Sequence, residues 1–166
     1  RVVVLINKYY DGVVPPTGEL SDIDKETLDK LQKFPEIISS SIERYRFREA
    51  LSELMNLARL GNKYLADEEP WKQIKTNPER VKTIMNIALQ IATGLSVLCE
   101  PFLPFTSTKL KNILNVSSSA VDNTWDDVTS NSELIPSGHQ INKAELLFAK
   151  IEDVEASAAF WHMCDL

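Results

Sequence analysis

Cysteine, glycine and long apolar runs are all scarce in this chain of 166 residues. The two cysteines, Cys99 and Cys164, lie far apart without a CxxC motif, which argues against a disulfide framework or a zinc knuckle and favours reduced thiols. The five glycines stand alone, so the chain has no glycine-rich phosphate loop. Polar residues interrupt the longest apolar stretch, 84–98, before it reaches the ~18 residues of a membrane span. We therefore expect no membrane partner.

Templates for catalysis and for metal binding are missing as well. The sequence has no HExxH motif, and its two histidines, His139 and His162, have no metal-ligand spacing with the cysteines. His139 lies in a loop-like segment, where we expect it to be solvated or bonded to the backbone. The acidic run 67–69 precedes a proline and is interpreted as a helix end. We expect no catalytic residue, no metal site and no cofactor in this chain.

The charge balance is acidic, with 18 basic and 24 acidic residues and a net charge of −6. A protein that coats nucleic acid without specificity carries a basic excess, so this balance argues against that class and against a DNA partner. It leaves room for a small basic face around a specific RNA contact. The chain starts with Arg1 and has no signal-peptide pattern, and we interpret its start as a cut through a longer protein.

Apolar residues recur at helical spacing along most of the chain. The last turns of a helix are expected over 1–10, with a stop at Asp11 and Gly12. A second helix is expected from Ser21 or Asp22 to residue 45, with a kink or break near Pro35. Further helices are expected over 47–65, from 77 to 98, and from 106 or 107 to about 114. The fourth is apolar around much of its circumference, which is typical of the centre of a bundle.

The remaining segments are expected to be connections. The connections are 13–20 and 116–145, the second with one short turn around Trp125. The last segment, 143–166, is expected to be helical in part and to pack back on the bundle through 146–148 and Ile151. The fold class predicted is all-α, an antiparallel bundle of four to five helices. Residues 1–153 are expected to form the bundle, and 154–166 a tail with no assigned role.

One segment combines an aromatic residue with nearby lysines. Trp71 follows Pro70 just past the third helix, with Lys63 and Lys72 on either side in sequence. A tryptophan held outward there could stack on a base of single-stranded RNA, and the lysines would suit its phosphates. The alternative is that Trp71 caps the core of the bundle, and composition alone favours that alternative.

Several segments share an order and spacing with a known family. They are Arg1 followed by 6–12 (INKYYDG), then 62–64 (NKY) leading to 70–71 (PW), 100–104 (EPFLP) and 147–153 (LFAKIED). Together they resemble the anticodon-binding domain of methionyl-tRNA synthetases, which are class I aminoacyl-tRNA synthetases. The resemblance implies a helical bundle that reads the methionine anticodon CAU. The Pro-Trp pair and the Lys-Ile-Glu-Asp element favour this family over the leucyl, isoleucyl, valyl or cysteinyl synthetases.

The resemblance also implies roles for individual residues. It assigns Trp71 to stacking on the first anticodon base and Arg1 to base contacts; the asparagine that pairs with the arginine would precede residue 1. Because stacking alone tolerates any base, we expect discrimination to come from hydrogen bonds around Trp71, including those of backbone groups near Pro70. Possible further RNA contacts are Asn62, Lys63 and Lys72, with a structural role for Asn62 as the alternative.

The implied partners are tRNA(Met) and the protein's own N-terminal catalytic domain, in a cytoplasmic, ATP-dependent methionine–tRNA ligase. Signature motifs of the adenylation site are absent from this sequence, so ATP with Mg²⁺, and zinc, are implied only for that catalytic part. The competing hypothesis is an acidic helical bundle with a structural or protein-interaction role and no RNA binding. The two hypotheses make different predictions for Trp71. RNA binding requires an exposed Trp71 beside Arg1, with a basic face around Lys63 and Lys72.

Overall fold

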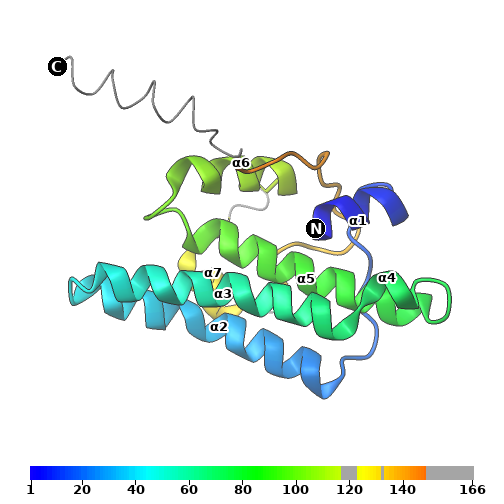
Figure 1. Cartoon of the computed structure of the whole chain (residues 1–166), viewed down its shortest axis with the longest axis horizontal. Helices are drawn as coiled ribbons and strands as arrows, with labels where there is room; N and C mark the ends of the chain where they lie inside the picture. Colours follow the sequence, from blue (N-terminus) through cyan, green and yellow to red (C-terminus); the bar gives the residue numbers. More distant parts are fainter. Residues whose placement is uncertain (117–122, 132, 149–166) are drawn as a thin grey trace, which may run out of the picture.

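The structure is a computed structural model that describes residues 1–116, 123–131 and 133–148. Within these ranges the chain forms helices and no strand, apart from one isolated β-bridge (Figure 1). The helices are α1 (Val2–Tyr9), α2 (Asp22–Glu43), α3 (Phe47–Glu68), α4 (Pro70–Gln73), α5 (Pro78–Leu98), α6 (Pro104–Leu114) and α7 (Trp125–Ser130). Two of these are short, and the all-α antiparallel bundle predicted from the sequence is confirmed.

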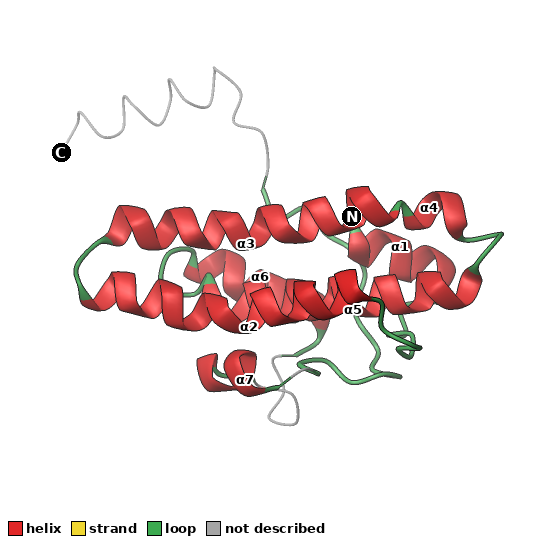
Figure 2. Ribbon diagram, turned by 90° about the horizontal axis from the view of Figure 1, so that it is seen from below, coloured by secondary structure: helices red, strands yellow, loops and turns green. Residues whose placement is uncertain are grey.

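Helix α5 is the central element, as its apolar circumference predicts. The other six helices all pack against it, and α2 and α3 also pack on each other as an antiparallel hairpin (Figures 1 and 2). By length and composition α5 is the one described helix that could cross a membrane, in spite of its polar interruptions. However, 83% of its apolar window is buried inside the bundle, which is the environment of a core helix.

Helix α2 begins where the sequence predicts and ends at Glu43, two residues before the predicted end. Ser21 and Asp24 form a capping box, in which each side chain accepts a hydrogen bond from the other residue's backbone N–H. A break near Pro35 was the wrong expectation, because α2 runs through Pro35 as one helix of 22 residues. Pro35 is buried, so tertiary packing of the apolar stripe outweighs the one backbone hydrogen bond that proline removes.

The end of α1 is tied to a distant part of the chain. The predicted stop is confirmed, since Asp11 and Gly12 both have positive φ, of 50° and 80°. The Ile141 amide then donates to the Gly12 carbonyl at 2.8 Å, and the Val14 amide to the His139 carbonyl at 2.9 Å. The positive φ of Gly12 favours glycine, and a Cβ there would also lie 2.5 Å from Nε2 of Gln140, so that side chain would have to shift.

Two buried amides of α5 hold the connecting segments against the bundle. The Gln90 Oε1 accepts hydrogen bonds from the Leu134 and Ile135 amides, at 2.7 and 3.1 Å. Its Nε2 donates to the Ile135 carbonyl at 2.9 Å, and Asn86 donates to the Pro15 carbonyl at 2.8 Å. These polar residues inside an apolar helix therefore satisfy backbone groups that the long connections would otherwise bury without partners.

The start of α6 and the segments that follow it differ in part from the prediction. Helix α6 starts at Pro104 rather than 106 or 107, because proline fits the first helical position. The short turn expected around Trp125 is α7. The described residues 143–148 are not helical; Leu147 packs against the core, whereas Leu146 and Phe148 are exposed. The expectations for Ile151 and for the tail 154–166 fall outside the described residues.

Candidate functional site

The Pro-Trp segment forms a sharp turn between α3 and α4. Glu69 ends α3 in the left-handed conformation, with φ 40°, and Pro70 opens α4 at its first position. The Pro70 ring is buried, while Trp71 is 41% exposed. The turn thus fixes the proline in the fold and leaves a large part of the indole accessible, so Trp71 does not simply cap the core.

The exposed indole lies beside the first helix. Arg1, Val4, Leu5 and Trp71 line one open pocket of about 570 Å³, between α1 and α4. Both helices pack on α5, and both views place them side by side (Figures 1 and 2). Arg1 is exposed, and it is the only charged residue that lines this pocket. The structure therefore brings together the two residues to which the resemblance assigns contacts with anticodon bases, at positions 70 residues apart in sequence.

This pocket has the surfaces that a flat, partly polar ligand needs. Val4, 54% exposed, and the indole of Trp71 offer apolar faces for stacking. The guanidinium of Arg1 supplies a planar set of donors for the edge of a base. An aromatic nucleobase fits this combination.

Behind the turn, a buried ionic network joins three helices. Arg80, at the start of α5, forms ion pairs with Asp24 of α2 and, at 2.9 Å, with Glu68 of α3. The Tyr64 hydroxyl donates a 2.7 Å hydrogen bond to Asp24, whose side chain is fully buried. Tyr64 itself lies in the core, and sequence reasoning missed this network, whose members are 12 to 56 residues apart.

The pKa values follow from this arrangement. Burial by itself raises the pKa of the Asp24 carboxyl, but hydrogen bonds from Arg80, Tyr64 and Ser21 favour the charged form and leave the pKa below its ordinary value. Burial and the bond to Asp24 both raise the pKa of the Tyr64 hydroxyl. The hydrogen bond to Asp24 raises the pKa of Arg80, although burial opposes it. These three directions favour a charged Asp24, a charged Arg80 and a neutral Tyr64 at neutral pH, which suits a structural network.

The remaining candidates lie around the turn or away from it. Lys72 is exposed and forms an ion pair with Glu69 at 2.7 Å. Asn62 and Lys63 are exposed on α3, and neither lines the pocket of Trp71. Lys63 belongs to a separate groove between α2 and α3. The expected basic face around Trp71 is therefore divided between two surfaces, and RNA contact by these three residues stays a prediction.

No other constellation suited to catalysis or metal binding appears in the described parts of the chain. No group of three or more histidines, cysteines or carboxylates there could hold a metal ion. The Nε2 of His139 lies 3.0 Å from the Leu114 carbonyl, so the expected backbone bond is confirmed. Burial raises the pKa of the Cys99 thiol, which disfavours the nucleophilic thiolate.

Comparison with known proteins gives a consistent result. The family model described as "Anticodon binding domain of methionyl tRNA ligase" matches residues 14–163. Methionine–tRNA ligases of Flavobacterium psychrophilum and Christiangramia forsetii are 65% and 66% identical over 153 and 155 residues, which is 92% of this chain and 22% of each relative. The chain thus spans about a fifth of the length of these curated relatives.

A solved structure supports the fold independently of close sequence similarity. The crystal structure of the apo form of Mycobacterium tuberculosis methionyl-tRNA synthetase superposes with a TM-score of 0.81 at 19% identity. The match covers 92% of this chain and 30% of that one. At this identity the likeness concerns the arrangement of the helices.

Proposed function

The chain belongs to the family of anticodon-binding domains of methionyl-tRNA ligase, and from this premise we propose that it recognises the CAU anticodon of tRNA(Met) in the pocket between α1 and α4. The observation that carries the proposal is the shared pocket of Arg1 and Trp71. Trp71 stacks on an anticodon base, and this contact is worth about 1–3 kcal/mol but tolerates any base. Discrimination comes from hydrogen bonds around the stacked base, supplied by Arg1 and by backbone groups next to Pro70.

In the intact protein this domain serves a ligase reaction. We infer that a catalytic part outside this chain binds ATP and methionine and charges the acceptor end of the same tRNA, in the cytoplasm. Anticodon binding then selects which tRNA reaches that centre. The acidic net charge of −6 agrees with a site that reads a few unpaired bases and makes few phosphate contacts.

The competing interaction function has one observation in its favour. Val4, Leu5 and Trp71 form a small apolar patch, which could equally receive a side chain of a partner protein. An RNA site and a protein site at this patch differ in what Arg1 must do, since base-edge donors are needed only for RNA.

Binding of anticodon stem-loops tests the proposal. The full chain is titrated with a CAU stem-loop and with one whose first anticodon base is changed. We expect preference for CAU, and we expect Trp71→Ala to abolish it with a loss of about 1–3 kcal/mol in binding free energy. The preference is lost because a base that is no longer stacked is not held where Arg1 and the backbone groups form hydrogen bonds to its edge. The matched control is Phe105→Ala, which removes an aromatic ring that is 90% exposed on α6, away from the pocket, and leaves the preference intact.

Two results would overturn the proposal. One is a CAU preference that survives Trp71→Ala at full strength. The other is equal binding of both stem-loops by the wild-type chain and also by a longer protein with about ten upstream residues restored. The second result would favour the interaction function.

A further inference from the structure

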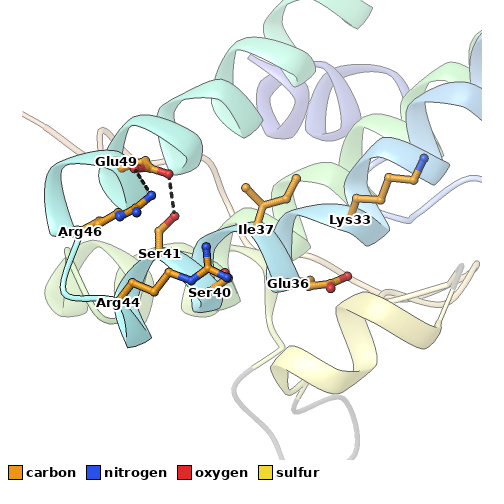
Figure 3. A pocket seen from close by; sticks show the side chains of 8 residues that line it. All are labelled: Lys33, Glu36, Ile37, Ser40, Ser41, Arg44, Arg46 and Glu49. Atoms are coloured by element: carbon orange, nitrogen blue, oxygen red, sulfur yellow. Dashed lines mark hydrogen bonds and ion pairs between the residues drawn. The ribbon is translucent and has the colours of Figure 1, made fainter.

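Two adjoining grooves run along the face of α2 and α3, and they share Lys33 and Ile37. One, of about 560 Å³, reaches the turn between the helices, where Arg44 and Arg46 lie (Figure 3). The other, of about 370 Å³, extends to Lys63 near the end of α3. We call this continuous surface the α2–α3 groove. At 1.5 Å per helical residue, it follows α3 for about 25 Å from Arg46 to Lys63.

The α2–α3 groove concentrates positive charge in an acidic chain. Its lining contains six basic side chains: Lys30, Lys33, Arg44, Arg46, Arg59 and Lys63. Only three acidic side chains accompany them: Glu36, Glu49 and Glu53. The whole chain has the opposite balance, with 18 basic and 24 acidic residues. The groove is therefore a local basic surface of the kind that attracts a polyanion.

Four of these six cations form no ion pair within the part of the chain that the structure describes. Lys30 is paired with Glu26 at 2.6 Å, and Arg46 with Glu49 at the long distance of 3.6 Å. Across the described residues, the side chains of Lys33, Arg44 and Lys63 form no ion pair or hydrogen bond, although Lys63 is near enough to Glu26 to help lower the pKa of that carboxyl. Their charges are thus available to a ligand, without the cost of breaking an internal pair.

Exposed aromatic rings lie at the turn where the groove ends. Tyr45 and Phe47 are 83% and 57% exposed, and their ring centroids are 6.3 Å apart in an edge-to-face arrangement. In sequence they alternate with Arg44, Arg46 and Arg48. Basic residues interleaved with exposed aromatics suit nucleic acid, because the cations meet phosphates and the rings meet unpaired bases. An acidic protein segment would use the cations but not these separate ring faces.

We propose that the α2–α3 groove binds the sugar-phosphate backbone of the same tRNA outside its anticodon, an inference that rests on the proposed function. The pocket of Trp71 has a single cation, so it can select a base but gains little from phosphates. The α2–α3 groove has several cations, which bind phosphates whatever the base sequence of the RNA. Affinity and anticodon selectivity are then supplied by two different surfaces.

The test compares two variants with the same net charge. Lys33→Gln/Lys63→Gln removes two unpaired cations from the groove. Lys25→Gln/Lys143→Gln removes two exposed lysines that line neither the groove nor the pocket of Trp71. Each protein is titrated over a series of salt concentrations with full-length tRNA carrying CAU and with the same tRNA carrying a changed anticodon.

We expect the groove variant to bind both tRNAs several-fold more weakly, by the same factor, with the CAU preference unchanged. The slope of log affinity against log salt should fall by about one for each lysine that contacts a phosphate. The control variant should match the wild type in slope. A combined Lys33→Gln/Lys63→Gln/Trp71→Ala variant should lose both affinity and selectivity.

Each failure has its own signature. If the groove and control variants share the wild-type affinity and slope, the groove does not contact RNA and the inference is wrong, whether or not Trp71 reads the anticodon. If the groove variant loses CAU preference, the groove belongs to base reading and backbone binding is wrong. If the wild type binds both tRNAs equally while the groove variant still loses slope, the anticodon proposal fails and the groove inference stands. Absence of tRNA binding overturns both.

Discussion

The Tyr64 hydroxyl donates a 2.7 Å hydrogen bond to the fully buried carboxylate of Asp24, 40 residues earlier in the chain. Arg80 completes this contact with its own bonds to Asp24 and Glu68. The start of α2, the end of α3 and the start of α5 are thus joined directly beneath the turn that carries Trp71. The stability of the bundle and the geometry of its candidate site depend on the same residues.

Removal of Arg80 should be strongly destabilising. In Arg80→Gln the Asp24 carboxylate stays buried without its cation, and we expect a loss of about 3 kcal/mol in the free energy of unfolding. The control is Lys82→Gln, which breaks an ion pair with Glu79, whose side chain is 78% exposed, and should cost about 1 kcal/mol or less. Urea titration measures both. Equal midpoints for the two variants would contradict a structural role for the network.

Stability should also depend on pH through Asp24. Because its folded pKa lies below the ordinary 3.8, its contribution to unfolding free energy is complete above that value and is lost as the pH falls through the folded pKa. We expect the stability difference between the wild type and Asp24→Asn to shrink below pH 4 and to be constant from pH 5 to 7. A difference that does not change with pH would show that the pKa of Asp24 is the same in the folded and unfolded states, which would contradict its stabilisation by the network.

Alanine substitutions at two glycines should show separately the stability cost of backbone strain and the cost of steric conflict. Gly12 and Gly138 have φ of 80° and 83°, but only Gly12 is crowded, by Gln140 Nε2 and the Ile141 carbonyl. Gly138→Ala should cost about 1 kcal/mol through the positive φ alone. Gly12→Ala should cost about 1 kcal/mol more, because Gln140 must give up its hydrogen bond to the Asp11 carbonyl. Thermal unfolding of both variants measures the difference, and equal losses would contradict the crowding.

Arg1 should contribute specificity through the shape of its guanidinium. Arg1→Lys keeps the charge and loses the planar set of donors, whereas Arg1→Gln loses the charge as well. We expect both variants to lose CAU preference in stem-loop binding, by about tenfold for one lost base contact of 1–3 kcal/mol. If Arg1→Lys keeps the full preference, Arg1 acts only as a charge and not as a reader of a base edge.

Features that depend on local sequence could be predicted well. The apolar spacing of α3 and α5, the Ser21 cap and the stop at Gly12 all follow from neighbours within a few residues. Pro35 shows where local rules fail, because a buried position in a long packed helix outweighed the usual effect of proline.

Features that depend on long-range contact could not be predicted from pattern. Asn86 and Gln90 were noted only as interruptions of an apolar stretch, since their partners lie 44 to 71 residues away. The pairing of Arg1 with Trp71 came from the family resemblance, and no periodicity indicates it. The basic groove was missed because its lysines and arginines come from two helices and gather only when these pack side by side.

The turn at Pro70 has a consequence for the speed and cost of recognition. Glu68 is held by Arg80, the Gln73 side chain donates to the Glu68 carbonyl, and the Lys72 amide donates to Glu69. The backbone turn that carries Trp71 is therefore formed when the chain folds, before any RNA arrives. A base that stacks there loses conformational entropy itself, but the protein loses little more, because its backbone turn is already ordered. Encounter with a preorganised platform needs no slow rearrangement, so differences between anticodons should appear in how long the RNA stays rather than in how fast it arrives.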